Sequence, residues 1–327
     1  MIWLQFLLSA AAVVVAAIKL AEYGDVIAVR TRLSGMFIGT LLLAGATSLP
    51  ELLSAVSALG IDAPNLAAGS MFGSVMFNMF MLAVLDLLNQ QARILRRVAM
   101  NHALTASLAN LLLGLALFFL LANMPTKIGW VGLDSLVIIL AYAGGVRLIQ
   151  VNGGKPPTEV ESSMDGIPGL NRALAGFGIA TLALVFVTPV LVRSANEIGL
   201  VTGLSAGFVG ATLIGITTSL PELVATIAAV RIGAYDLAVG NLFGSNLFNV
   251  FAIGLTDVLY LEGRFLGVID PVFAQVGLLG LILTALGLIG NIARVERRLV
   301  FVELDALLIL LGYLLGMYYL YTHGIGA

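Results

Sequence analysis

A glutamate directly follows a proline inside two strongly apolar segments of this chain. Residues 45–52 read GATSLPEL and residues 215–223 read GITTSLPEL, so Glu51 and Glu222 have hydrophobic residues on both sides. A proline inside a helix has no amide hydrogen and clashes with the carbonyl four residues back, so the helix kinks or breaks there. We expect the first break around Ala46 and Thr47, where freed backbone carbonyls beside a carboxylate would suit a bound cation.

Polar residues around these motifs recur with helical spacing. Thr47 and Glu51 are four residues apart, as are Ser74 and Asn78, and residues four apart lie on one face of a helix. The second half of the chain repeats both pairs. The oxygens that we expect to meet at one centre belong to Thr47, Glu51, Ser74, Asn78, Thr218, Glu222, Ser245 and Asn249.

All of these side chains are hard oxygen donors. The chain has no cysteine, and its two histidines, His102 and His323, lie near the ends of predicted segments, so a soft transition-metal site is not expected. Ca²⁺ takes about six to eight oxygen ligands in a flexible cage, which two carboxylates, freed carbonyls and water can supply. We expect a transported cation at this centre and no cofactor.

The composition predicts an all-α integral membrane protein. The chain has 327 residues, of which 60% are hydrophobic and 10% charged, against about 25% charged in ordinary soluble domains. Apolar stretches of about 20 residues can cross a bilayer as helices. Ten such stretches lie near residues 2–22, 36–59, 66–88, 99–122, 128–149, 172–195, 204–230, 236–260, 270–292 and 302–322. The first lacks the basic start of a cleaved signal peptide, so we interpret it as a transmembrane segment.

The SLPE string also fits a capping box, with Ser48 as N-cap and Glu51 at the third helical position. We expect that geometry where a half-helix restarts after the break. It does not explain why both copies place the break inside a membrane segment, where an ionised side chain costs about 2.5–3.5 kcal/mol.

The chain is an internal duplication with a constant offset. The residue numbers of Glu51 and Glu222 differ by 171. Adding 171 also maps Pro50 onto Pro221 and, without insertion or deletion, the residues from Gly39 to Tyr142 onto the second half. Each half has five predicted segments, an odd number, so the second half must enter the membrane upside down. Inverted repeats of this kind are typical of secondary transporters that bind their substrate near the midplane.

The expected organisation is a first five-helix repeat over residues 1–150, a short cytoplasmic linker over 151–171, and a second five-helix repeat over 172–327. The linker is polar and rich in Gly and Pro, and too short for a folded domain. In the GSMFGS and GNLFGS strings, we expect Gly69, Gly73, Gly240 and Gly244 to let helices approach closely.

The distribution of basic residues predicts the orientation. Of the 16 Lys and Arg, Lys19 lies within the first segment and three lie in even-numbered loops, namely Lys127, Arg193 and Arg264. The other twelve lie in odd-numbered loops, so both termini should face away from the cytoplasm of a cell (inner, plasma) membrane protein. The net charge of −2 and the lack of a basic tail do not indicate nucleic-acid binding, and the bilayer is the only partner we expect.

The duplicated SLPEL and G-S-x-x-F-N blocks resemble the alpha repeats of prokaryotic sodium/calcium exchangers, in the cation/calcium exchanger superfamily. The resemblance covers nearly the whole chain. It implies an antiporter that works by alternating access, with a central calcium site surrounded by sodium sites. It implies that Glu51 and Glu222 are the calcium-binding carboxylates, with backbone oxygens near Thr47 and Thr218. Ser48, Ser74, Asn78, Ser219, Ser245 and Asn249 resemble the surrounding sodium and calcium ligands.

The two copies differ from each other and from some family members. Asn241 and Asn246 stand where the first copy has Ser70 and Val75, which argues against these extra amides as ion ligands, and we expect Asn246→Val to be mild. Asn249 stands where some exchangers and the potassium-dependent branch carry Asp, which argues against potassium coupling. The linker lacks the calcium-sensing insertion of animal exchangers.

The sequence is compatible with other functions as well. A site of charge −2 is neutralised by one Ca²⁺, two Na⁺ or two protons, so a proton/calcium antiporter of the same fold is the nearest alternative, although its typical GNATE-like motif is absent. A cation channel could also use oxygen-lined midplane sites. An enzyme is not expected, because a hydrolase using Ser48 or Ser219 would need a general base that the sequence does not place nearby.

Overall fold

The computed structural model describes residues 1–30, 43–89, 102–152, 168–231, 233–293, 298–299 and 302–322. In the first half the helices are α1 (Ile2–Arg30), α3 (Leu49–Leu59), α4 (Pro64–Leu88), α6 (Ala103–Ala122) and α7 (Leu133–Asn152). The second half has α8 (Leu170–Thr202), α9 (Ala206–Val209), the π-helix η1 (Gly210–Ile214), α10 (Gly215–Thr218), α11 (Leu220–Arg231), α12 (Tyr235–Leu259), α13 (Phe265–Val268), α14 (Phe273–Ala293) and α15 (Leu304–Thr322). The predicted linker falls mostly outside the described residues.

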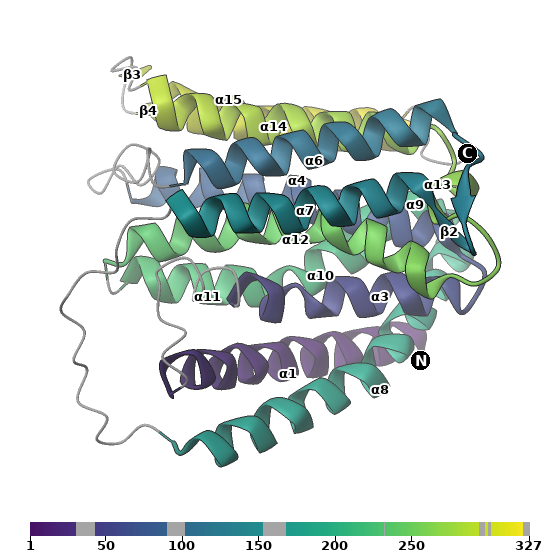
Figure 1. Ribbon diagram of the computed structural model, residues 1–327, viewed down its shortest axis with the longest axis horizontal. Coiled ribbons are helices and arrows are strands. Elements are labelled where there is room, and N and C mark those ends of the chain that lie inside the picture. The colour runs from purple at the N-terminus through teal and green to yellow at the C-terminus, as the bar shows by residue number, and fades with distance from the viewer. Residues whose placement is uncertain are drawn as a thin grey trace.

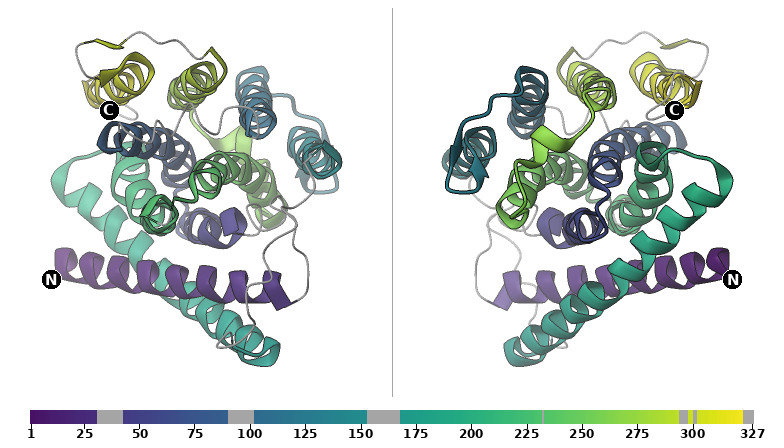
Figure 2. Two further views of the ribbon diagram at one scale, coloured as in Figure 1. Left: turned by 90° about the vertical axis from the view of Figure 1, so that its left-hand side faces the viewer. Right: turned by 90° about the vertical axis from the view of Figure 1, so that its right-hand side faces the viewer.

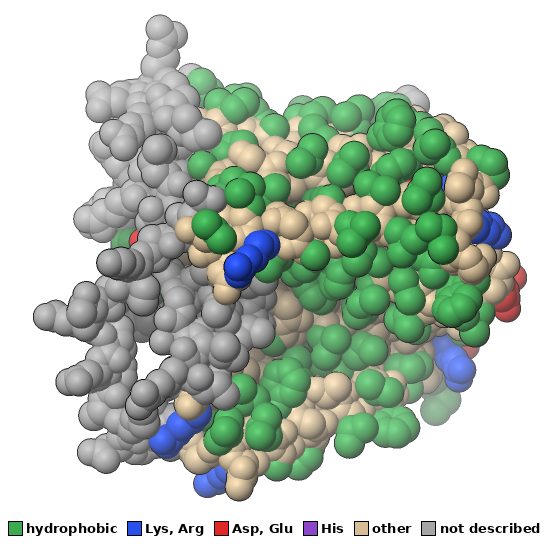
Figure 3. Space-filling model, viewed as in Figure 1, with side chains coloured by type: hydrophobic (Ala, Val, Ile, Leu, Met, Phe, Trp, Pro, Cys, Tyr) green, Lys and Arg blue, Asp and Glu red, His purple; other side chains and the backbone are tan. Residues whose placement is uncertain are grey.

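The helical membrane fold is confirmed. Within the described part of the chain, seven helices are long and apolar enough to cross a membrane, and an eighth span forms if α9 to α11, bent by 41° at its break, is taken as one. The two other predicted spans coincide with shorter apolar helices at Leu43–Leu59 and Phe273–Ile289. Hydrophobic side chains cover the flank of the molecule, and most of the charged side chains in view lie toward its ends (Figure 3).

Two β-hairpins replace the expected start of two spans. The segments predicted to begin at residues 128 and 302 start instead with β2 (Val131–Gly132), paired with β1 (Lys127–Ile128), and β4 (Val302–Glu303), paired with β3 (Arg298–Leu299). The two hairpins differ in number by 171 and lie at opposite ends of the molecule (Figure 1). Duplicated elements therefore lie at opposite ends of the bundle.

The helices α4 and α12 form the centre of the bundle. α4 packs against α3, α12, α14 and α15, and α12 packs against α6, α7 and α11. α1 and α8 pack on each other along one side of the molecule, over α3, α10 and α11 (Figure 1, Figure 2). The helices that carry the SLPE motifs thus lie between this outer pair and the central pair.

Close packing joins the two halves at the centre. A Cβ atom at Gly69 would collide with the carbonyl of Gly207, and one at Gly73 would collide with the backbone of Ala211. The predicted packing role of these two glycines is confirmed, because α4 can approach α9 and η1 only where side chains are absent. For Gly240 and Gly244 close packing remains a prediction.

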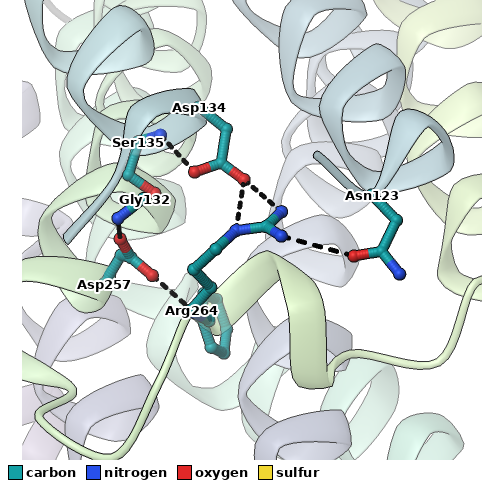
Figure 4. A network of polar contacts seen from close by, with 7 residues as sticks. Asn123, Gly132, Asp134, Ser135, Asp257 and Arg264 are labelled. Atoms are coloured by element: carbon teal, nitrogen blue, oxygen red, sulfur yellow. Dashed lines mark hydrogen bonds and ion pairs between the residues drawn. The ribbon is translucent and has the colours of Figure 1, made fainter. Parts of the chain in front are cut away.

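A buried polar network closes the end of the bundle that holds the β1–β2 hairpin (Figure 4). Arg264 forms an ion pair of 2.7 Å with Asp134, at the start of α7, and donates to Asn123, at the end of α6. Asp257, at the end of α12, accepts hydrogen bonds from the backbone amides of Gly132 and Phe265. The network ties α6, α7 and the hairpin of the first half to α12 and α13 of the second.

Candidate cation site

Both SLPE motifs interrupt their helices, and the first break lies one residue later than expected. The turn falls at Ser48, with φ −89° and ψ 5°, and at Ser219, with φ −88° and ψ 2°. An α-helix has ψ near −42°. Because Pro50 and Pro221 provide no N–H, the carbonyls four residues back lose their helical donors. The two copies therefore share one backbone bend.

Each glutamate lies in the first turn of the half-helix that restarts after the bend. Glu51 is the third residue of α3 and Glu222 is the third residue of α11. Helix N-termini carry a partial positive charge that favours a carboxylate. Both side chains are fully buried.

The serines bind the glutamates of the opposite halves. Ser48 donates a hydrogen bond of 2.8 Å to Glu222 Oε1, and Ser219 donates one of 3.0 Å to Glu51 Oε1. Ser245 also donates to Glu222 Oε1 at 2.8 Å and lies against Ser48 Oγ. The two motifs, 171 residues apart in sequence, form a single polar centre.

This arrangement corrects the capping-box interpretation. Ser48 occupies the N-cap position of α3, but its side chain makes no capping hydrogen bond to that helix. A hydroxyl has one hydrogen, and the hydrogen of Ser48 is directed to Glu222 instead. The serine of the motif therefore serves the contact between the halves.

The carboxylates lack a positive partner among the described residues. Glu51 Oε2 and Glu222 Oε2 are buried without a hydrogen-bond partner, and no Lys, Arg or His in the described ranges pairs with either side chain. An ionised carboxylate in a low-dielectric interior is strongly unfavourable unless it is paired. This centre therefore favours a bound cation or protonation of the glutamates.

The threonines make local contacts. The hydroxyl of Thr47 donates to the carbonyls of Leu43 and Ala44, and that of Thr218 donates to Ile214 and Gly215. These hydroxyls retain lone pairs, but their hydrogens are used within their own helices.

The remaining predicted residues come from the two central helices. Ser74 donates to the carbonyl of Gly215 in the other half, at 3.2 Å. Asn78 donates from Nδ2 to Asn246 Oδ1 at 2.9 Å, and its own Oδ1 has no partner among the described residues. Asn249 is 1% exposed, and neither of its amide atoms is hydrogen-bonded to a described residue. Several buried oxygens are thus available to a ligand.

The described part of this centre consists of Glu, Ser, Thr and Asn side chains, and the exclusion of a soft metal site remains a prediction. In the part of the chain that the structure describes, no group of three or more His, Cys, Asp and Glu side chains could hold a metal ion. His102 lies 3.7 Å from Asp236, at the ends of α6 and α12, and His323 lies outside the described residues. The centre offers two carboxylates and neutral oxygens, a set suited to hard cations.

Sequence reasoning missed two residues of this region. It treated Asn246 as dispensable, although Asn246 holds Asn78, and it did not single out Thr284, which accepts from Asn246 Nδ2 at 3.4 Å. The duplication gave no signal for either residue, because the corresponding residues of the first half are the apolar Val75 and Leu113.

A family model described as sodium/calcium exchanger protein matches residues 1–149 and 172–322. Among curated proteins, the chain is 29% identical over 249 residues to the inner membrane protein YrbG of Escherichia coli (strain K12). That match covers 72% of this chain and 71% of YrbG.

Two solved structures share the fold. The sodium-calcium exchanger NCX_Mj has a TM-score of 0.63 at 23% identity, with 98% of this chain and 100% of that chain covered. The H⁺/Ca²⁺ exchanger CAX has a TM-score of 0.66 at 15% identity, with 97% and 87% covered. At such identities the likeness concerns the fold alone.

Proposed function

Since the chain belongs to the sodium/calcium exchanger protein family of membrane antiporters, we propose that it is a secondary active antiporter that exchanges Na⁺ for Ca²⁺ by alternating access. The observation that carries this proposal is the pair of buried carboxylates, Glu51 and Glu222, each bound by a serine of the opposite half. A cation bound there contacts both halves at once. Its presence or absence can therefore control how the halves move relative to each other.

The ligands proposed for the transported ions are the ten residues expected from the sequence. Glu51 and Glu222 would supply the charge, and the free oxygens of Asn78 and Asn249 would complete a calcium shell together with backbone carbonyls near Thr47 and Thr218. Ser48, Ser74, Ser219 and Ser245 would contribute hydroxyl oxygens. Na⁺ and Ca²⁺ are the transported substrates, and we propose no cofactor.

Charge balance would make the exchange obligatory. Two ionised glutamates give a charge of −2, which one Ca²⁺ or two Na⁺ neutralise, so the two substrates compete for the same oxygens. With a third Na⁺ bound, one net charge crosses the membrane per cycle, and the membrane potential contributes about 2.3 kcal/mol per 100 mV toward calcium extrusion.

The proposed architecture is ten transmembrane helices in two inverted five-helix repeats, over residues 1–150 and 172–327, with both termini outside the cytoplasm of the cell membrane. The hairpins at opposite ends of the molecule support the inversion. α1 and α8, the first and sixth segments, lie as a pair over the half-helices with the glutamates, which suits helices that gate access to the site.

A proton/calcium antiporter is the second candidate. The same observation favours it, because two buried carboxylates without a basic partner in the described residues can be neutralised by protons as well as by metal ions. The absence of a GNATE-like motif favours sodium, as do the oxygens of serine and asparagine that surround the glutamates. A channel is a weaker candidate, because secondary transporters typically have inverted repeats of this kind.

Transport in liposomes distinguishes the two couplings. Vesicles that contain the purified protein are loaded with Na⁺ and diluted into Na⁺-free buffer with radioactive Ca²⁺, beside vesicles with only a pH gradient. The proposal predicts sodium-driven uptake that an inside-positive potential enhances. Uptake driven by the pH gradient alone would assign proton coupling instead.

A further inference from the structure

A chain of hydrogen bonds leads from a backbone carbonyl in α14 to the side chain of Asn78. The hydroxyl of Thr284 donates to the carbonyl of Gly280 at 2.8 Å, and Asn246 donates from Nδ2 to Thr284 Oγ1 at 3.4 Å. Asn78 then donates from Nδ2 to Asn246 Oδ1 at 2.9 Å. The side chains of Thr284, Asn246 and Asn78 are all at most 1% exposed.

The direction of this chain is fixed by its first member. A backbone carbonyl only accepts hydrogen bonds, so the single hydrogen of Thr284 must point to Gly280. Thr284 can then only accept, so Asn246 must turn its NH₂ group toward Thr284 and its oxygen toward Asn78. Asn78 must in turn present its NH₂ group to Asn246. The hydrogen bond of Thr284 to Gly280 therefore determines which atom of Asn78 is left free.

The atom left free is an oxygen. Asn78 Oδ1 is buried and has no hydrogen-bond partner among the described residues. An amide that could rotate would present either a donor or an acceptor to an ion, and only the acceptor binds a cation. The hydrogen bonds through Asn246 and Thr284 remove this choice before the ion arrives, and such preorganisation increases affinity.

The repeat partner of Asn78 has no such support. Asn249 corresponds to Asn78 by the offset of 171, and the counterparts of Asn246 and Thr284 are Val75 and Leu113, which cannot donate or accept. Both amide atoms of Asn249 lack a hydrogen bond to a described residue. The two asparagines therefore differ in their freedom although they occupy equivalent places in the two halves.

We propose that Asn246 and Thr284 are positioning residues that hold Asn78 as a preset oxygen ligand for the transported cation, whereas Asn249 is an adaptable ligand that turns to suit the ion. This inference rests on the proposed function, since it assumes a cation at the centre between the halves. It reverses the expectation that Asn246→Val is mild. The residues that touch the ion are symmetric between the halves, and the residues that orient them are not.

The test is Ca²⁺ binding by the purified full-length protein, measured from the rise of its melting temperature with Ca²⁺ concentration. Thr284→Val removes the hydroxyl that accepts from Asn246 without a large change in the shape of the side chain. Thr284→Ser keeps this hydroxyl. Loss of one buried hydrogen bond should weaken binding about three- to tenfold in the valine variant, while the serine variant should stay within about twofold of the wild type. Asn246→Val should weaken binding at least as much.

Thr256→Val is the matched control. Thr256 is also fully buried and donates to a carbonyl of its own helix, at Ala252, but its hydroxyl accepts from no side-chain amide of the described residues. We expect its Ca²⁺ affinity to equal that of the wild type.

A double-mutant comparison separates positioning from general loosening of the core. If Thr284 acts through Asn78, adding Thr284→Val to Asn78→Ala should cause no further loss of affinity, whereas adding it to Asn249→Ala should cause its full three- to tenfold loss. Wild-type affinity in both Thr284→Val and Asn246→Val, or equal further losses on the two asparagine backgrounds, would overturn the inference and leave the proposed function intact. A wild-type protein that binds neither Ca²⁺ nor Na⁺ would contradict the proposed function itself.

Discussion

The hydroxyl of Ser48, in the first half of the chain, donates a 2.8 Å hydrogen bond to the carboxylate of Glu222, in the second half. The reciprocal bond runs from Ser219 to Glu51. Because each motif supplies a donor to the other motif's acid, neither half alone forms the complete centre. This exchange of partners explains how a duplicated sequence can build one site instead of two.

Removal of the serine hydroxyls should weaken cation binding unequally. Among the serines of the described residues, Ser48 and Ser245 both donate to Glu222, whereas Ser219 donates to Glu51. Hydrogen bonds to charged groups contribute about 1.5–3 kcal/mol, so Ser219→Ala should raise the KM for Ca²⁺ about tenfold or more, and Ser48→Ala less. The measurement is the calcium dependence of sodium-driven uptake.

The control for the serine variants is Ser57→Ala. Ser57 lies on α3, the same helix as Glu51, and its hydroxyl donates to the carbonyl of Leu53 and to no carboxylate of the described residues. Its KM should remain that of the wild type. Equal effects of the three serine variants would contradict the assignment of the hydroxyls to the carboxylates.

Neutralisation of either glutamate should abolish calcium transport while the protein remains folded. Glu51→Gln or Glu222→Gln keeps the size of the side chain but removes half of the charge that balances Ca²⁺. Each substitution also removes a buried negative charge, which is unfavourable in the folded protein when no cation is bound. We therefore expect a melting temperature without ions that is equal to or higher than that of the wild type. The exposed Glu197 provides the control Glu197→Gln. Near-normal transport by either motif variant would disprove the two-carboxylate site.

A side chain at the centre of the bundle should prevent the halves from packing. Gly73→Ala places a Cβ against the backbone of Ala211 in η1, which cannot move aside as a side chain can. Overpacking costs about 1–3 kcal/mol or more, so the variant should have a lower melting temperature and lose transport. At Gly144, on α7, an added Cβ meets no atom of a described residue within 4 Å, so Gly144→Ala should behave as the wild type. Equal stability of the two variants would contradict the close approach of α4 and η1.

Loss of the buried ion pair at the end of the bundle should destabilise the protein without affecting ion selectivity. Arg264→Ala leaves Asp134, which is 1% exposed, as an unpaired buried charge. Breaking such a pair from one side costs about 3–5 kcal/mol. The double variant Arg264→Met with Asp134→Leu removes both charges and should recover most of that loss. Thermal unfolding measures both effects, and a single variant as stable as the wild type would show that the network in Figure 4 does not hold the helices together.

The sequence predicted the helical membrane fold and the bends beside Glu51 and Glu222, because hydrophobic length and proline act locally. It did not predict which serine binds which glutamate, since that depends on how the two halves meet. It extended two spans over residues that form β-hairpins, because Val131 and Val302 are as apolar as helix residues. Thr284 carried no signal, because its hydrogen bond to Asn246 depends on how α12 and α14 pack, and its counterpart in the first half is the apolar Leu113.

We propose that one site, shared by the two halves, binds either Ca²⁺ or Na⁺. The most direct measurement is equilibrium binding of radioactive Ca²⁺ to the purified protein at increasing Na⁺ concentration, for the wild type, Glu51→Gln and Glu222→Gln. We expect one Ca²⁺ per chain, displaced completely by Na⁺, and no measurable binding in either variant. Binding that persists in both variants, or that Na⁺ does not displace, would contradict a shared site between Glu51 and Glu222.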